Sequence, residues 1–254
     1  MQCSILIRTL NEKDNLKILF KKLENQTFQN FEVVLIDSGS NDGTLEFLKD
    51  YKFNFKFKFL RINPKEFSFG RALNKAAENS EYKDILISLS AHCFPNDIYT
   101  FERILMNFED NEVGLVYGKQ VGYVFTPLSE AVHLNSWFGE EKIKSKESIF
   151  SNNGFSAFRY EFWKENNFDE NVSGCEDIIF TKRIVDENFY VVYEPNGIVS
   201  HFHKENYKTI YNRFYREAII LNSFFGFKLK LSEAIFSFIS ECRNDISNRK
   251  IMVF

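Results

Sequence analysis

Segments rich in polar residues follow several apolar runs of the sequence at the point where each run ends. They are Thr9, Asn11 and Glu12 after the first run, Asp37 and Ser38 after the second, and Ser90, Ala91 and His92 after a later one. Ligands of open α/β sheets bind where the carboxyl ends of the strands meet, so we expect these segments to form one site. An acid that ends a buried strand before a Ser-Gly turn suits the base and ribose of a nucleotide.

Each of these acids also has a structural interpretation. Asp37 could cap a turn, although an acid that ends an apolar strand at this place favours contact with a ligand. Asp42 stands before Gly-Thr and an apolar run, which favours the role of a helix N-cap. Glu12 fits equally well as a ligand contact and as an acid of a first helical turn, where the helix dipole stabilises it.

A second acidic pair, Glu176-Asp177, lies between a Ser-Gly-Cys turn and the apolar run Ile178-Ile179-Phe180. An acidic first helical turn is the ordinary explanation of such a pair. However, the apolar run indicates that this end of the helix is buried, and buried carboxylates without a partner are costly. The pair is therefore a candidate for acid–base chemistry. His201 and His203 alternate along an expected strand, and we interpret His201 as a site residue and His203 as a packing residue.

Two further segments could contact a ligand. Arg71 stands at the start of an expected helix, where a basic residue gains nothing from the helix dipole, and this favours a contact with phosphate. Asn153 and Gly154 could donate backbone amides to the hydroxyls of a sugar or an acceptor, and Asn-Asn-Gly is equally an ordinary turn.

The first half of the chain alternates between strand-like and helix-like segments. Strands are predicted at 3–9, 31–37, 55–62 and 84–90, with helices at 12–25, 45–51 and 69–78. This rhythm predicts an α/β fold, in which a Rossmann-like, mostly parallel sheet is flanked by helices. The less regular second half predicts strands at 113–123, 190–193 and 197–203, and helices at 127–138 and 175–187.

From residue 205 onward the pattern is helical, with a break at 225–227. We therefore expect a nucleotide-binding and catalytic domain over 1–204 and a C-terminal helical segment over 205–254. Residues 204–230 hold six basic and two acidic side chains among aromatic residues at helical spacing. Such a segment predicts packing against the catalytic domain, a homodimer contact, or peripheral contact with a membrane.

Composition excludes several classes of protein. The chain has 254 residues, 30 Phe and 11 Tyr, too much aromatic surface for a disordered protein. Its net charge of −3 gives no reason to expect a nucleic-acid partner. The four cysteines are scattered, which argues against a disulfide framework or a zinc ribbon. The longest uncharged run is too short to span a bilayer, and residues 1–10 lack a basic region, so we expect a cytoplasmic protein.

The motifs, taken in order, resemble the family 2 glycosyltransferases of the GT-A fold. Thr9 to Glu12 match its T-x-N-E motif, and Asp37 to Thr44 match D-x-x-S-x-D-G-T. The stretch Phe69 to Asn74 resembles the G-R-x-x-N segment of rhamnosyltransferase-like members. The resemblance covers roughly residues 1–203, and its specificity lies in the combination of motifs.

This resemblance implies a function. An inverting enzyme would move a sugar from a nucleotide-diphosphate sugar to a hydroxyl of a glycan or lipid-linked acceptor, in the synthesis of bacterial surface polysaccharides or glycoconjugates. Asp177 would be the catalytic base with Glu176 beside it. The donor would bind along Thr9, Asn11, Glu12, Asp37, Ser38 and Arg71, with its diphosphate toward Ser90, Ala91 and His92. The basic, aromatic segment over 204–230 would allow this cytoplasmic enzyme a peripheral contact at the inner face of the membrane.

One motif departs from the family pattern. Where the family has a metal-binding D-x-D, this chain has Ser90-Ala91-His92. Serine is a poor metal ligand, and histidine prefers ions softer than Mg²⁺. The substitution puts the use of Mn²⁺ or Mg²⁺ in doubt. Two alternatives follow: His92 and His201 hold Mn²⁺ between them and the diphosphate, or His92 contacts the diphosphate directly.

Two rival functions stay open. A nucleotidyltransferase shares the layered α/β topology but would be expected to carry a Gly-rich basic loop after the first strand, and residues 8–15 contain no glycine. A non-catalytic nucleotide-sugar-binding or scaffold protein would explain the lost D-x-D, whereas the retained Glu176-Asp177 pair speaks against it.

Overall fold

The sheet at the centre of the molecule has nine strands in the described part of the chain. The computed structural model describes residues 1–123, 126, 128–201, 207–226 and 228. The strands follow the order β3-β2-β1-β4-β8-β6-β9-β5, and β7 pairs with β9. Their bounds are β1 Cys3–Thr9, β2 Phe31–Asp37, β3 Lys56–Arg61, β4 Ile85–Ser90, β5 Cys93–Pro95, β6 Val113–Gly122, β7 Ile143–Ser145, β8 Phe155–Arg159 and β9 Tyr190–His201.

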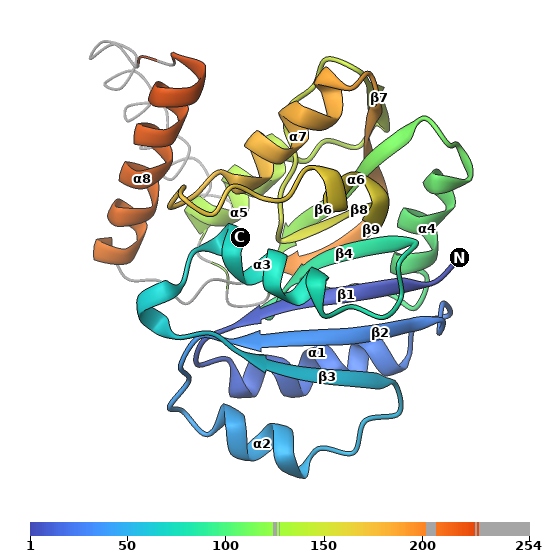
Figure 1. Cartoon of the computed structure of the whole chain (residues 1–254), viewed down its shortest axis with the longest axis vertical. Helices are drawn as coiled ribbons and strands as arrows, with labels where there is room; N and C mark the ends of the chain where they lie inside the picture. Colours follow the sequence, from blue (N-terminus) through green and yellow to red (C-terminus); the bar gives the residue numbers. More distant parts are fainter. Residues whose placement is uncertain (124–125, 127, 202–206, 227, 229–254) are drawn as a thin grey trace, which may run out of the picture.

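Helices lie on both faces of this sheet (Figure 1). They are α1 Lys13–Glu24, α2 Thr44–Asp50, α3 Phe69–Glu78, α4 Thr100–Leu105, α5 Leu128–Trp137, α6 Tyr160–Glu165, α7 Glu176–Asp186 and α8 Tyr207–Phe225, with short 3-10 turns at Pro64–Glu66 and Met106–Glu109. The predicted α/β architecture with flanking helices is confirmed. No helix in the described part is both long and apolar enough to cross a bilayer.

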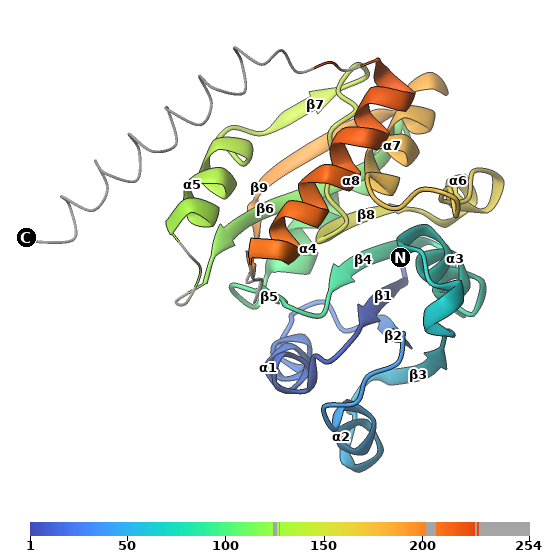
Figure 2. The ribbon, with the colours of Figure 1, turned by 90° about the vertical axis from the view of Figure 1, so that its left-hand side faces the viewer.

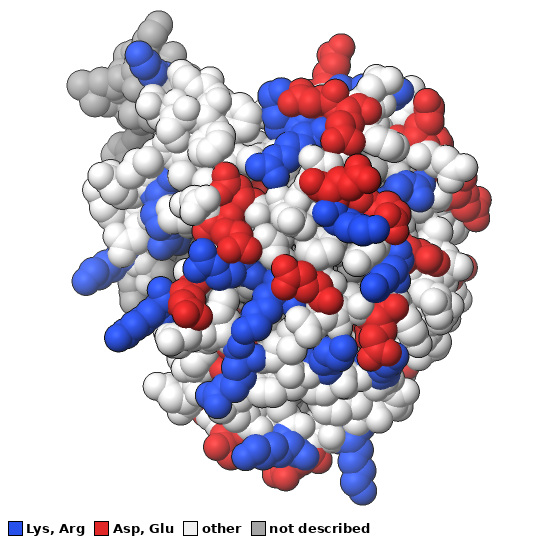
Figure 3. Space-filling model, in the orientation of Figure 1, with Lys and Arg blue, Asp and Glu red and all other residues white. Residues whose placement is uncertain are grey.

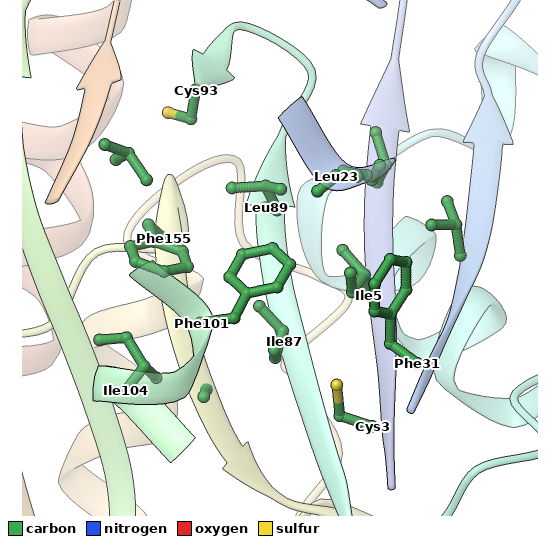
Figure 4. Close-up of a cluster of buried hydrophobic side chains, with 14 of the residues drawn as sticks. Cys3, Ile5, Leu23, Phe31, Ile87, Leu89, Cys93, Phe101, Ile104 and Phe155 are labelled. Atoms are coloured by element: carbon green, nitrogen blue, oxygen red, sulfur yellow. The ribbon is translucent and has the colours of Figure 1, made fainter. Parts of the chain in front are cut away.

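Two apolar layers hold the helices on the sheet, because successive strand residues point to opposite faces. Ile5 and Ile7 of β1 pack with α1 and α4 on one face, whereas Leu6 packs with α3 on the other. Phe101 of α4 reaches deep into the first layer, where its ring centroid lies 5.9 Å from that of Phe155 (Figure 4).

The sheet is mixed, and this refines the predicted, mostly parallel arrangement. Strands β1 to β4 are mutually parallel, but β8 inserts antiparallel between β4 and β6. The short strands β5 and β7 also run antiparallel to β9. Neither these three strands nor the helices α4 and α6 were predicted.

A single strand, β9, replaces the two strands predicted at 190–193 and 197–203. Its pairing with β6 jumps from Glu194–Gly118 to Ile198–Lys119, so the residues between Glu194 and Ile198 form a bulge. The proline within this bulge interrupts the strand pattern of the sequence, so one strand was predicted as two. Residues 202–206, including His203, lie outside the described residues, as does the boundary predicted at residue 204.

The carboxyl ends of the parallel strands meet at one edge of the sheet, and α8 lies across this edge. Figure 2 views the molecule from that side and shows α8 in front of β6, β8 and β9. Gly226, with φ of 65°, follows the helix in the left-handed conformation, where a break was predicted. Ile220 anchors α8 by packing with Val172 and with Ile179 of α7.

Candidate functional site

A pocket of about 540 Å³ lies at the edge of the sheet where the strands end, beneath α8. We call it the main pocket. It brings together the predicted site residues Ser90, His92, Asn153, Gly154, Glu176, Asp177 and His201. Segments that are far apart in the sequence therefore share one site, as the resemblance implied.

The acidic pair stands in the first turn of α7. Cys175, just before the helix, has a φ of 55°, a left-handed conformation that costs free energy in a non-glycine residue. This sharp entry directs Glu176 and Asp177 toward the pocket. Asp177 accepts hydrogen bonds from the backbone N–H of Asn153 at 3.1 Å and of Ile178 at 2.9 Å.

Glu176 and Asp177 have different electrostatic environments. Glu176 is buried and accepts hydrogen bonds from the Arg8 guanidinium at 2.9 Å and from the Asn153 side-chain amide at 3.3 Å. Burial, followed by repulsion from Glu176, raises the pKa of Asp177 to about 7. A carboxylate with such a pKa can take up a proton near neutral pH. Asp177 is thus suited to general-base catalysis, and Glu176 is held in an ion pair.

A chain of polar contacts surrounds the histidines. His92 contacts Glu12 through Nδ1 at 2.8 Å and Ser90 Oγ through Nε2 at 3.1 Å. Its ring stacks on that of His201, with 5.2 Å between the centroids and 11° between the planes. His201 Nδ1 in turn contacts Gln120 Oε1 at 2.6 Å. The two histidines are therefore brought together as predicted.

The two rings do not form a metal site by themselves, and a metal ion shared between the histidines and a donor diphosphate stays a prediction. The lone pairs of imidazole nitrogens lie in the ring plane, so stacked parallel rings do not direct them at one point between the faces. Among the described residues, no three His, Cys, Asp or Glu side chains are grouped to hold a metal ion. The oxygen ligands that Mg²⁺ and Mn²⁺ prefer are also replaced by Ser90 and His92.

The loop after β2 is shaped by its own side chains. Asp37 is fully buried, and its carboxylate accepts backbone hydrogen bonds from Gly39 at 2.9 Å and Ser40 at 3.1 Å. Ser38 donates its backbone N–H to the Thr9 carbonyl at 3.1 Å. Asp37 thus has the turn-capping contacts that the sequence left as its alternative role. Its contact with a nucleotide stays a prediction.

The loops after β1 and β2 are also linked to each other. Asn11 has a φ of 58°, and its backbone N–H donates to Ser40 Oγ at 2.7 Å. Asp42 accepts a hydrogen bond from the Thr44 backbone N–H at 3.0 Å, so its role at the start of α2 is structural, but the N-cap itself is Gly43 and not Asp42 as predicted. Thr9, Asn11, Glu12, Asp37, Ser38 and Ala91 do not line the main pocket. Any contact that they make with a donor remains a prediction.

Arg71 lies in a neighbouring pocket of about 430 Å³, which we call the side pocket. Its Nε donates to Glu170 at 2.7 Å, and another guanidinium nitrogen donates to the Glu66 carbonyl at 2.7 Å. Arg71 does not line the main pocket. Its contact with the donor phosphate therefore stays a prediction.

Several residues that line the main pocket were not predicted as site residues from the sequence. Arg8 precedes the recognised T-x-N-E motif and pairs with an acid that is distant in the sequence. Arg213, Arg216, Glu217 and Leu221 of α8 also line the main pocket. Their spacing places them on one face of a helix. The sequence does not show which face of this helix meets the catalytic domain, so it could not identify them as pocket residues.

Comparisons with known proteins show what the chain is similar to. The profile described as Glycosyl transferase family 2 matches residues 4–170. The chain is 27% identical over 208 residues to the O-antigen chain rhamnosyltransferase WbaN of Salmonella anatum, covering 77% of this chain and 64% of that protein. It is 24% identical over 220 residues to a Methanococcus voltae protein, covering 81% of this chain and 68% of that protein. That protein is named dolichyl N-acetyl-alpha-D-glucosaminyl phosphate 3-beta-D-2,3-diacetamido-2,3-dideoxy-beta-D-glucuronosyltransferase.

The fold agrees with a solved structure as well. The mannosyltransferase PcManGT from Pyrobaculum calidifontis, in complex with GDP-Man and Mn²⁺, superposes with a TM-score of 0.66 at 16% identity. The match covers 82% of this chain and 59% of that one. The present chain thus spans less than two thirds of the length of the Salmonella protein and of the mannosyltransferase.

Proposed function

Because the chain belongs to glycosyl transferase family 2, we propose that it is an inverting enzyme that transfers a sugar from a nucleotide-diphosphate sugar to an acceptor hydroxyl. The observation that carries this proposal is Asp177, which lines the main pocket with a pKa of about 7. Glu176 is neutralised by Arg8, so one carboxylate of the pair is available as a base. A single displacement with inversion needs one such base.

In the proposed step, Asp177 takes the proton of the acceptor hydroxyl while that oxygen attacks the anomeric carbon of the donor. The new carbon–oxygen bond forms on the face opposite the diphosphate, and the bond to the diphosphate breaks with its electron pair. Base catalysis of this kind contributes about 10²–10⁴-fold to the rate.

The donor is proposed to bind beside the loops after β1 and β2, with its diphosphate toward Ser90 and His92. His92 is held by Glu12, so its ring orientation is fixed before a ligand arrives. Mn²⁺ is bound in the mannosyltransferase structure, but in the described part of this chain no three His, Cys, Asp or Glu side chains are grouped to hold a metal ion. The proposed step is therefore assigned only to side chains of this protein.

The acceptor is proposed to be a glycan or a lipid-linked glycan of a surface polysaccharide or glycoconjugate. The Salmonella relative is named for O-antigen, and the Methanococcus relative is named for a dolichyl phosphate-linked sugar. We further propose that the enzyme works at the cytoplasmic face of the membrane through its C-terminal segment, residues 205–254.

Replacing the base tests this function. Asp177→Asn should keep nucleotide affinity, measured by calorimetry with UDP, GDP and dTDP, and should lower transfer by about 10²–10⁴-fold. Asp186→Asn makes the same change at the exposed end of the same helix and should leave both quantities unchanged. Near-normal transfer by Asp177→Asn would contradict the assignment. Nucleotide binding without transfer in the parent protein would favour the non-catalytic alternative.

A further inference from the structure

Two buried serines lie side by side among the apolar residues of the sheet. Ser88 of β4 and Ser156 of β8 are cross-strand partners, and both are almost fully buried. Buried hydroxyls need hydrogen-bond partners, and these two find them in the same residue. Ser88 Oγ donates to the Asn153 backbone carbonyl at 2.8 Å, and Ser156 Oγ donates to Asn153 Oδ1 at 3.1 Å. The sheet therefore holds Asn153 at two points, one on its main chain and one on its side chain.

The donors of Asn153 face the acidic pair of α7. Its backbone N–H donates to Asp177 Oδ2 at 3.1 Å, and its Nδ2 donates to Glu176 Oε1 at 3.3 Å. The same oxygen of Glu176 accepts the bond from Arg8 at 2.9 Å. An ionised carboxylate only accepts hydrogen bonds, so the amide nitrogen of Asn153 must face Glu176, and its oxygen must face the Ser156 hydroxyl. The partners on both sides thus fix one orientation of this amide.

These contacts occupy the groups that the sequence analysis assigned to a sugar or an acceptor. All four polar atoms of Asn153 have a partner within the protein. The Gly154 backbone N–H likewise donates to Asn152 Oδ1 at 2.8 Å. A sugar hydroxyl would have to displace one of these bonds, so the contacts favour a role for Asn153 toward the acidic pair.

We propose that Asn153 is a positioning residue, which fixes both carboxylates of α7 relative to the sheet and holds Glu176 in its ion pair with Arg8. This inference rests on the proposed function, in which Asp177 is the base. Hydrogen bonds donated to a carboxylate stabilise its charged form. Because Asn153 donates to both acids, it stabilises the negative charge that they share.

Several other groups set the charge state of the base. Burial and then Glu176 raise the pKa of Asp177, whereas the Asn153 backbone N–H and the charge of Arg8 lower it. Further charged or titratable side chains line the main pocket around the base: His92, Cys175, His201, Arg213, Arg216 and Glu217. All of them are retained in the variants below, so a change in the pH profile reports on Asn153.

The acid limb of the kcat/KM profile tests this role, because loss of a merely structural contact would not move it. Asn153→Asp places a carboxylate against Glu176 in place of the amide donor. It should move the acid limb to higher pH by about one unit or more, as expected for the loss of one hydrogen bond to a charged group. Asn153→Ala removes the donor without adding charge, so it should move the limb in the same direction by less. Both variants keep the backbone N–H that donates to Asp177.

Two further variants separate positioning from ligand contact. Ser156 lines neither pocket, so Ser156→Ala can reach the base only through the Asn153 amide, and it should also move the limb to higher pH. Nucleotide affinity, measured by calorimetry with a nucleoside diphosphate, should stay unchanged in Asn153→Ala and Ser156→Ala. Asn30→Asp adds a carboxylate at an exposed position outside both pockets and should keep the parent profile.

The remaining outcomes overturn the proposal. Asn153→Ala and Ser156→Ala add no buried charge, so they decide the question on their own if Asn153→Asp does not fold. A higher KM without a shift of the limb would assign Asn153 to sugar contact, and an equal shift in Asn30→Asp would show a nonspecific charge effect. A parent profile without an acid limb would contradict Asp177 as the base and this inference with it. A parent limb near pH 7 that no variant moves would contradict the role of Asn153 alone.

Discussion

At the scale of single residues, the charge state of Asp177 should control the rate of transfer. Its pKa of about 7 means that the base is protonated, and inactive, at lower pH. The value of kcat/KM should therefore fall as the pH drops below about 7. The positive charge of Arg8 lowers this pKa, so Arg8→Gln should move the acid limb of the profile to higher pH. A profile measured from pH 5 to 9 that is flat, or a shift to lower pH, would contradict this role.

Individual site residues differed in how far the sequence could predict them. The pair Glu176-Asp177 was recognisable because acids before an apolar run are costly unless they are used. The partner of Glu176 was not recognisable, because Arg8 lies 168 positions away in β1 and only the folded chain brings it to the start of α7. Asp37 was recognisable as an acid at a strand end, but its backbone hydrogen bonds depend on the fold of one loop.

At the scale of elements, the regular first half was predictable and the second half was not. Strands β1, β2 and β4 have largely apolar, buried runs, and β3 alternates basic and apolar residues. All four lie within a residue or two of their predicted bounds. Strand β8 carries a mixed pattern, since its pairing with both β4 and β6 buries small polar as well as apolar residues. The bulge in β9 interrupts its periodicity. These features arise from tertiary pairing, which local patterns do not encode.

The bulge of β9 lies so close to β6 that position 118 requires a residue without a side chain. A methyl group at this position would overlap the Gly197 carbonyl and the Phe155 ring. Gly118→Ala should therefore lower the free energy of unfolding by about 1–3 kcal/mol, measured by denaturant titration. Gly139→Ala is the matched control, because nothing lies within 4 Å of the added carbon. If the two variants had the same free energy of unfolding, the added methyl group at position 118 would be accommodated without loss of stability, which would contradict this prediction.

At the scale of the whole molecule, α8 has two different faces. One face lines the main pocket through Arg213 and Arg216 and is anchored by Ile220. Away from the pocket, what we call the outer face exposes large apolar or aromatic side chains: Tyr211, Phe214, Tyr215 and Ile219. Across the view in Figure 3, basic and acidic side chains are interspersed, so no continuous basic field for nucleic acid appears on that side.

The outer face should bring the site to an anionic membrane surface. Lys208 and Lys228 are exposed near the two ends of the helix, and each lysine near an anionic leaflet is worth about 1 kcal/mol. Tyr211 and Tyr215 stack with 6.0 Å between their centroids and remain mostly exposed, as suits aromatic rings that enter an interface.

Flotation with liposomes distinguishes this contact from a homodimer. The protein should float with anionic vesicles at low salt but not with neutral ones, and Lys208→Gln combined with Lys228→Gln should abolish flotation. Because these lysines do not line either pocket, the affinity for nucleotide should stay unchanged in the double variant. Absence of flotation, together with a dimer in solution that Tyr211→Ala dissociates, would assign the outer face to a second copy of the chain. The site beneath α8 would then lie at a subunit interface instead of a membrane surface.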